Sequence, residues 1–206
     1  MKLILVDRRV LVCAVFHTYF DDLPDVEIIN SPFEEIAEYD CMVSAANSFG
    51  LMDGGIDAAI TDYFGIQLMR RVQEYIIAEY RGEQPIGTSF IIETGHDKHP
   101  FLAHTPTMRI PMAIAHTDNV YAAMFAMLRA VHHHNRTDER KIDTVVCPGL
   151  GTGYGYVPFR EASRQMALAY RNFLNPPARI NWVYASIRQN DIRFGGDMGL
   201  DFKPEV

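Results

Sequence analysis

The residues with the clearest chemical potential lie in one stretch, VSAANSFGLMDGGIDAAI, from Val43 to Ile60. An apolar run that predicts a buried strand leads through a glycine-containing loop to an amphipathic segment that predicts a helix beginning close to Ile56. Gly54 and Gly55 therefore stand at the helix entrance, where free backbone N–H groups and the positive end of the helix dipole point outward. This arrangement can bind an anion such as phosphate, although glycines before a helix are often only a turn.

A second stretch, IDTVVCPGLGTGYGYVP, repeats this order of strand, glycine-rich loop and helix. Its strand is expected over 142–147 and its helix from about Pro158. The loop between them contains Gly149, Gly151, Gly153 and Gly155. Two such units in one domain predict two loops that close on a single elongated ligand at the carboxyl ends of the strands.

The first stretch resembles the signature of the macro domain family, in which a strand ending in N-A-A-N is followed by a loop ending in G-G-G-V-D and a helix. The two align without a gap, with matches at Asn47, Gly54, Gly55 and Asp57, whereas Ser44 replaces the first Asn. Further along, FLAHTP resembles the family's strand ending in H-x-V-G-P, and PGLGTGYGYVP takes the place of its second phosphate loop. The matches follow the family's order over roughly residues 26 to 190, which makes the resemblance specific.

The resemblance implies an ADP-ribose ligand with its diphosphate between the two glycine loops. Asn47 and Asp57 are the candidate catalytic residues: Asn47 matches the residue that holds the distal ribose, and Asp57 matches the acid proposed to position or activate water at the anomeric carbon. An acid in the first turn also stabilises any helix by roughly 0.3 to 1 kcal/mol, so a structural role for Asp57 stays open. The residues expected to contact the ligand are Ser31, Ala46, Gly54, Gly55, Ile56, Gly149, Gly151, Thr152, Gly153, Tyr154 and Arg188.

Recognition of the adenine base is where the chain departs from the family. The family often carries a Gly-Asp pair after the strand expected here at Val26–Ile29, and its Asp accepts a hydrogen bond from the adenine amino group. Asn30-Ser31-Pro32-Phe33 takes that place, and a Ser or Asn oxygen accepts such a bond more weakly than a carboxylate. The family also stacks a side chain on the base after its last strand, expected here over 180–185. Among residues 186–188, Arg188 is the one able to lie over a ring.

Length and composition predict one cytoplasmic domain. The chain has 206 residues, which we expect to form a domain over 1–190 and an irregular tail over 191–206. With 19 basic and 26 acidic residues the net charge is −7, and no run of Lys or Arg indicates a nucleic-acid partner. The start, MKLILVDRRV, reaches charged residues too soon for a signal peptide or a membrane span.

Neither cysteine nor histidine spacing predicts a metal or a cofactor. Cys13, Cys41 and Cys147 lie in or beside apolar runs without a C-x-x-C spacing, so buried free thiols in a reducing compartment are expected. His132-His133-His134 are consecutive residues of an expected helix, so their side chains point in different directions, as at a frayed and exposed helix end. His104 ends an apolar strand and is expected to be structural rather than catalytic.

The alternation of strand and helix patterns predicts an α/β fold, and the resemblance makes it a single three-layer α/β/α domain with a central mixed sheet of six to seven strands. Strands are expected over Leu3–Val6, Val10–Phe16, Val26–Ile29, Cys41–Ala46, Gly87–Thr94, Phe101–His104, Ile142–Cys147 and Ile180–Ala185. The first two are expected as a hairpin or as a strand with a bent connection. Helices are expected from Ile56, over Ile66–Tyr80 and Asn119–Val131, and over Phe159–Leu174.

Three functions stay open on the sequence alone. The first is a hydrolase that removes ADP-ribose from a protein, nucleic acid or small metabolite, centred on Asn47 and Asp57. The second is a module that binds free or attached ADP-ribose, or a related nucleotide, without turnover. The third is a structural component of a larger assembly, against which the two intact glycine loops argue. In another branch of the family an Asp follows the second loop and acts with a Lys; Gly155 stands here, so that chemistry is not expected.

Overall fold

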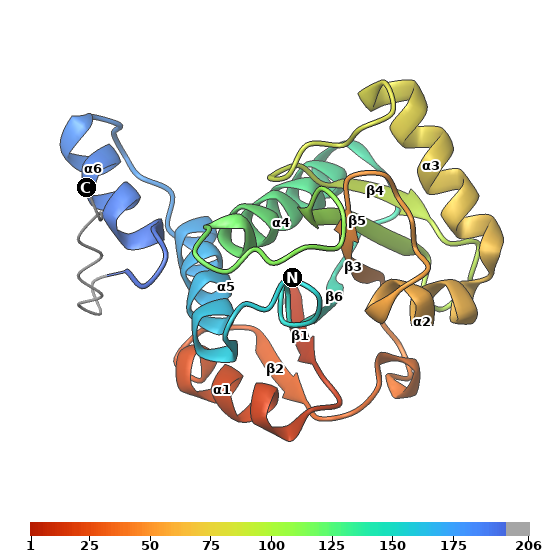
Figure 1. The fold of residues 1–206 in the computed structure, drawn as a ribbon, viewed down its shortest axis with the longest axis horizontal. Coiled ribbons are helices and arrows are strands. Elements are labelled where there is room, and N and C mark those ends of the chain that lie inside the picture. The colour runs from red at the N-terminus through yellow and green to blue at the C-terminus, as the bar shows by residue number, and fades with distance from the viewer. Residues whose placement is uncertain (197–206) are drawn as a thin grey trace.

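The computed structural model describes residues 1–196, which contain a six-stranded sheet in the order β2-β1-β6-β3-β5-β4 (Figure 1). Its strands are β1 (Lys2–Val6), β2 (Val26–Ile29), β3 (Cys41–Asn47), β4 (Phe90–Glu93), β5 (Phe101–Met108) and β6 (Thr144–Pro148). Neighbouring strands are parallel except at one edge, where β4 pairs with β5 antiparallel. The expected mixed sheet is confirmed.

Helices cover both faces of the sheet and complete three layers. They are α1 (Val10–Phe20), α2 (Gly55–Phe64), α3 (Ile66–Tyr80), α4 (Asn119–Thr137), α5 (Phe159–Leu174) and α6 (Trp182–Ile192), with a short 3-10 helix η1 (Phe33–Glu35) after β2. Leu3 and Leu5 of β1 pack in one core with α1, α4 and α5, whereas Ile4 and Val6 pack in a second core with α2 and α3. Burial on both faces explains why the central strands β3, β5 and β6 carry no Asp, Glu, Lys or Arg.

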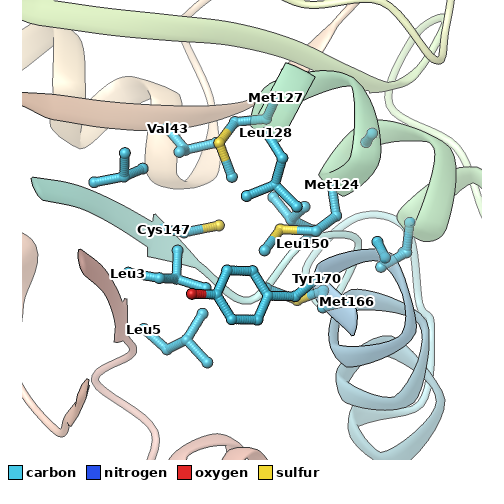
Figure 2. Close-up of a cluster of buried hydrophobic side chains, with 14 of the residues drawn as sticks. Leu3, Leu5, Val43, Met124, Met127, Leu128, Cys147, Leu150, Met166 and Tyr170 are labelled. Carbon is cyan, nitrogen blue, oxygen red and sulfur yellow. The ribbon is translucent and has the colours of Figure 1, made fainter. Parts of the chain in front are cut away.

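The larger core lies between the sheet and the helices α4 and α5 (Figure 2). Val43 and Cys147 from the strands share it with Met127 of α4 and Tyr170 of α5. The Tyr170 hydroxyl donates to the carbonyl of Pro24 at 2.9 Å, which satisfies the polar end of this buried ring. The buried free thiols expected at the three cysteines are also confirmed.

The segment after β1 is a helix, so the strand or hairpin expected over Val10–Phe16 is wrong. The run VLVCAVFHTYF is rich in β-branched and aromatic residues, which hides its helical period. In α1, Val12, Phe16 and Phe20 recur every fourth position and are buried, whereas Val10 and Leu11 are exposed. Packing of this face against α5 and the sheet overrides the local strand propensity.

The last strand, expected over Ile180–Ala185, is also wrong, because this segment enters α6. Asn181 caps the helix, since its side-chain oxygen accepts a hydrogen bond from the backbone N–H of Tyr184 at 2.9 Å. Trp182 and Val183 are exposed, so this apolar segment lacks the burial that a central strand requires. α6 contacts α5 and lies away from the sheet edge formed by β4 (Figure 1).

Other boundaries shift by short distances. β5 continues to Met108, beyond the expected strand end at His104. α4 continues to Thr137, so the three consecutive histidines belong to a regular helix and not to a frayed end. Residues 191 and 192, expected in the tail, complete α6, and the tail residues 197–206 lie outside the described part of the chain. Among residues 1–196, no helix has both the length and the apolar composition needed to cross a membrane.

Candidate functional site

A pocket of about 420 Å³ opens at the carboxyl ends of β1, β3 and β6. Its walls come from the β1–α1 connection, the segment after β2, the end of β3, the loop before α2 and the loop after β6. Parallel strands bring these connections to one edge of the sheet, where ligands of open α/β folds bind. The volume is that of a pocket for a small organic ligand.

Asn47 holds the first glycine loop, residues 48–54, in shape. Its Oδ1 accepts hydrogen bonds from the backbone N–H groups of Phe49 (3.0 Å) and Leu51 (3.3 Å), and its Nδ2 donates to the carbonyl of Leu51 (2.7 Å). Both lone pairs of Oδ1 are therefore used, and one amide N–H remains for the pocket that Asn47 lines. A ligand hydroxyl can accept from this N–H, but it can donate to Oδ1 only if the loop rearranges.

The first loop delivers the chain to the N-terminus of α2, which is open to an anion. Gly54 is the N-cap residue, has an extended backbone, and supplies no side-chain cap to the first turn. Gly55 has a φ of +57°, a conformation that favours glycine. Because Gly54, Gly55 and Ile56 line the pocket, the first-turn N–H groups and the helix dipole are available to a negatively charged ligand.

Asp57, in the first turn of α2, is a buried acid on the pocket wall. Only 4% of its surface is exposed, and its Oδ1 accepts a hydrogen bond from the Ser44 hydroxyl at 2.7 Å. Burial raises the pKa of Asp57 to about 7; the Ser44 hydroxyl opposes the rise and the charge of Asp53 adds to it. Asp57 can therefore exchange a proton near neutral pH, as a general acid or base must.

The second glycine loop, residues 149–157, folds tightly on itself. The backbone N–H of Val157 donates to the carbonyl of Gly151 at 3.1 Å. Gly151 has a φ of +71°, and a Cβ atom there would lie 2.8 Å from Cγ2 of Val120 in α4. A Cβ atom on Gly155 would lie 2.5 Å from the carbonyl oxygen of Gly151. The packing of the loop itself therefore requires these two glycines.

Tyr154 of the second loop reaches across to the first. Its Cε2 atom lies 3.4 Å from the place of a Cβ on Gly54 and 3.8 Å from that of a Cβ on Gly55. The residue is 56% exposed and lines the pocket. The cleft between the two loops is therefore narrow, and glycine at position 54 preserves the space beside the ring.

A charged connection after β1, which no motif in the sequence indicated, forms a further side of the pocket. The Arg9 guanidinium donates to both carboxylate oxygens of Asp7 at 2.8 and 2.7 Å, and to the carbonyl and hydroxyl oxygens of Thr152 at 3.1 and 2.7 Å. Arg8 forms an ion pair with Glu34 of η1 at 3.0 Å. The available signal was their position directly after a strand, because that is the ligand edge of a parallel sheet.

The two residues considered for base recognition take different places. Ser31 lines the pocket, and its hydroxyl donates to the carbonyl of Pro32 at 3.0 Å, which leaves its oxygen as an acceptor. Asn30 donates through Nδ2 to the carbonyl of Asp7 at 2.7 Å and is not part of the pocket lining that the structure describes. Ser31 is therefore the residue that a ligand can reach.

The structure brings together every residue expected in the site except Arg188. The pocket is lined by Ser31, Ala46, Asn47, Gly54, Gly55, Ile56, Asp57, Gly149, Gly151, Thr152, Gly153 and Tyr154. Arg188 lies on α6, where its guanidinium is 5.9, 5.4 and 5.7 Å from the ring centroids of Tyr121, Phe125 and Tyr184. Because the preceding segment is a helix and not a strand of the sheet, Arg188 does not reach the edge where the pocket opens.

His104 lies in the core rather than at the pocket. It is fully buried, and its Nδ1 is 2.6 Å from Oε1 of Gln84. Burial lowers the pKa of His104 to about 3, which keeps the ring neutral at neutral pH. In the described residues, 1–196, no group of three or more His, Cys, Asp or Glu side chains is arranged to hold a metal ion.

Comparison with known proteins identifies relatives with this fold. The macro domain family model matches residues 43–166. An uncharacterised protein of Aquifex aeolicus is 30% identical over 149 residues, which are 72% of this chain and 82% of that protein. A DNA ADP-ribosyl glycohydrolase of Mycobacterium tuberculosis is 27% identical over 143 residues, 66% of this chain but 36% of that protein.

Solved structures agree at the level of the fold. A mutant macrodomain of Oceanobacillus iheyensis with ADPR has a TM-score of 0.60 and 21% identity, over 77% of this chain and 87% of that one. The three-layer α/β architecture expected from the sequence is thus confirmed.

Proposed function

The chain belongs to the macro domain family, and we propose that it binds ADP-ribose in the pocket between its two glycine loops and hydrolyses an ADP-ribosyl linkage there. The observation that carries this proposal is the joint presence of an open helix N-terminus and a buried acid, Asp57, in one pocket wall. The M. tuberculosis relative, named a DNA ADP-ribosyl glycohydrolase, supports the same reaction class.

The diphosphate would lie between the two loops. The N–H groups of Gly54, Gly55 and Ile56 on one side, and those of residues 151–154 on the other, can replace the water shell of its oxygens. On the same rim, Arg9 neutralises the charge of Asp7 and donates to Thr152 of the second loop. Together these groups favour a doubly charged anion.

The distal ribose would lie toward Asn47 and Asp57. The free N–H of the Asn47 amide can donate to a ribose hydroxyl. Asp57 would accept a proton from water while the water oxygen bonds to the anomeric carbon and the bond to the leaving group breaks, with the bonding electron pair leaving with that group. A carboxyl that titrates near neutral pH suits this step.

Binding without turnover is the second candidate, and the state of Asn47 favours it. Because Oδ1 of Asn47 already accepts two loop N–H groups, the amide cannot hold the ribose from both sides without a loop change. A site of this kind binds ADP-ribose without fixing the anomeric carbon for attack. The two candidates share the ligand and differ in the role of Asp57.

Binding is tested first by calorimetry with free ADP-ribose. Wild-type protein is expected to bind in the micromolar range, and Gly54→Glu to lose the signal because a carboxylate enters the diphosphate path. Gln67→Glu, the same added charge at an exposed position of α3, is the control and should bind like the wild type. Absence of heat with the wild type would overturn the nucleotide proposal.

Turnover is tested with an ADP-ribosylated oligonucleotide and an ADP-ribosylated peptide, with release of ADP-ribose as the readout. Asp57→Asn should keep binding and lose release, since an amide cannot accept the proton. Release that persists in Asp57→Asn contradicts the role of Asp57. Binding without release in the wild type, on both substrates, favours the second candidate.

A further inference from the structure

Ser44 contacts Asp57 but has no role in the ligand binding and water activation proposed above. It is fully buried on β3, and its hydroxyl donates to Oδ1 of Asp57 at 2.7 Å. In residues 1–196 the structure gives the Asp57 carboxyl no other hydrogen-bond partner. The hydroxyl is therefore the group that compensates for the loss of water around this acid.

The strand that carries Ser44 is a rigid support. β3 pairs with β5 along its length, with Ser44 in register with His104, and it pairs with β6 at Cys41 and Met42. A donor on such a strand holds Oδ1 in one place. The second carboxylate oxygen, Oδ2, is then the one left for water or ligand in the pocket that Asp57 lines.

Charged groups around Asp57 do not supply this compensation. Asp53, in the first loop, disfavours the ionised form, and β3, on which α2 packs, carries no charged residue. Across the pocket, Arg8 and Arg9 are each paired with an acid of their own. Arg71 of α3 donates to the backbone carbonyls of Glu93 and Thr94. The other charged residues of α2 and α3 are exposed: Asp62, Arg70, Glu74 and Glu79.

We propose that Ser44 is the positioning residue of this site: its hydroxyl fixes the Asp57 carboxyl on the pocket wall and, as a hydrogen-bond donor, favours the ionised form of that carboxyl. The inference rests on the function proposed above, because it describes how Asp57 is prepared to take a proton from water. Without the hydroxyl, the buried carboxyl retains its own proton to higher pH and cannot accept another. Ser44 acts through Asp57 and does not itself contact the reacting atoms.

The direct test is a titration of Asp57 by carbon-13 NMR of its carboxyl, with the resonance assigned by its absence in Asp57→Asn. Ser44→Ala is expected to raise the titration midpoint by about 1 to 2 pH units, the size of a hydrogen bond to a charged group. Ser44→Thr retains the hydroxyl and should return the midpoint toward the wild-type value. An unchanged midpoint in folded Ser44→Ala overturns the proposal.

The matched control is Ser163→Ala. Ser163 is also a buried serine, but its hydroxyl has no hydrogen-bond partner within the described residues, so the same deletion should leave the midpoint of Asp57 unchanged. A shift as large as that of Ser44→Ala would show a general effect of core substitution and overturn the assignment. If Ser44→Ala does not fold, Ser44→Cys, of similar size but a weak donor, serves the same comparison.

The titration needs no ligand, so its outcome is independent of the proposed function. A wild type that fails to bind ADP-ribose overturns that function, and the midpoint still decides on Ser44. Where release of ADP-ribose is measured, its pH profile should move upward in Ser44→Ala together with the NMR midpoint. A loss that is equal at every pH, without movement of the profile, indicates a merely structural serine and contradicts the proposal.

Discussion

The two glycine loops line the same pocket, but they need their glycines for different reasons. In the first loop, Gly54 has an extended backbone and a Cβ would meet the Tyr154 ring at 3.4 Å, an ordinary contact. In the second, a Cβ on Gly155 would lie 2.5 Å from the carbonyl oxygen of Gly151. The fold therefore tolerates a Cβ at position 54, on the pocket wall, whereas it requires glycine at position 155.

The loops also differ in what holds them. The first is held mainly by side chains: the Asn47 amide bonds to its backbone, and Thr61 of α2 and Gln73 of α3 donate to its carbonyls at Met52 and Gly50. It ends on the dipole of α2. The second is held by its own backbone and by contacts from outside, since Ile114 N–H donates to the Gly155 carbonyl at 2.9 Å and Arg9 bonds to Thr152. A glycine-rich motif thus combines glycines that the fold requires with glycines that we propose for binding, and substitution at each position separates the two.

The largest effect is expected from Gly155→Ala. The new Cβ conflicts with a backbone oxygen that cannot move without opening the loop, so the free energy of unfolding should fall by about 3 kcal/mol in urea denaturation. Gly153→Ala is the control, because a Cβ there meets nothing within 4 Å and the residue has no positive φ. It should change stability by less than about 0.5 kcal/mol. Equal losses in the two variants would contradict the difference between these glycines.

Gly153→Glu should separate binding from folding within the second loop. The position lines the pocket and its Cβ has open space, so the fold should tolerate the residue while the carboxylate repels the diphosphate. We expect the affinity for ADP-ribose to fall about tenfold to a hundredfold, or about 1.4 to 2.7 kcal/mol, by calorimetry. Gly153→Gln, which has the same size without the charge, should lose less. Unchanged affinity in Gly153→Glu would place the diphosphate elsewhere.

The acid beside the first loop should reduce stability at high pH. The pKa of Asp57 in the folded protein, about 7, lies above its ordinary value of 3.8. The contribution of protonated Asp57 to the free energy of unfolding is therefore full below pH 3.8 and is lost as the pH rises through about 7. Asp57→Asn removes this buried charge and should raise the free energy of unfolding by at least about 1 kcal/mol at pH 8, since one pKa unit corresponds to about 1.4 kcal/mol. Denaturation at pH 4 is the control, where little gain is expected. The same gain at both values would refute the explanation.

The smallest effect is expected where the second loop meets the β1–α1 connection. Arg9→Met removes two hydrogen bonds to Thr152 and leaves Asp7 unpaired beside the ligand, so the affinity for ADP-ribose should fall about threefold to tenfold. The double variant with Asp7→Asn should recover part of this loss, because the unpaired acid is gone. Arg8→Met is the matched control, since Arg8 pairs with Glu34 of η1 and not with a glycine loop. A greater loss of affinity in Arg8→Met than in Arg9→Met would contradict the role given to Arg9.

The local sequence pattern predicted the secondary structure correctly where it fitted a strand and not a helix. β3 and β6 could be predicted directly, because both faces of these strands are covered and their sequences therefore lack charged residues. The same criterion was wrong for α1 and for residues 180–185, which lead into α6, because their apolar residues suit either structure. α1 is a helix whose buried face packs on α5 and the sheet, whereas α6 contacts α5 and has no buried residue.

The sequence by itself determined the α/β class, the two glycine loops and the pairing of Asn47 with Asp57 in one site, because glycines, amides and first-turn acids act through the backbone next to them. Only the tertiary structure decided which distant residues join that site. It brought Asp7, Arg8 and Arg9 to the pocket through the parallel pairing of β1, took Arg188 away from it, and set Ser44 against Asp57. Such contacts join residues that are far apart in the chain, and burial, which raises the pKa of Asp57, exists only once the layers have packed.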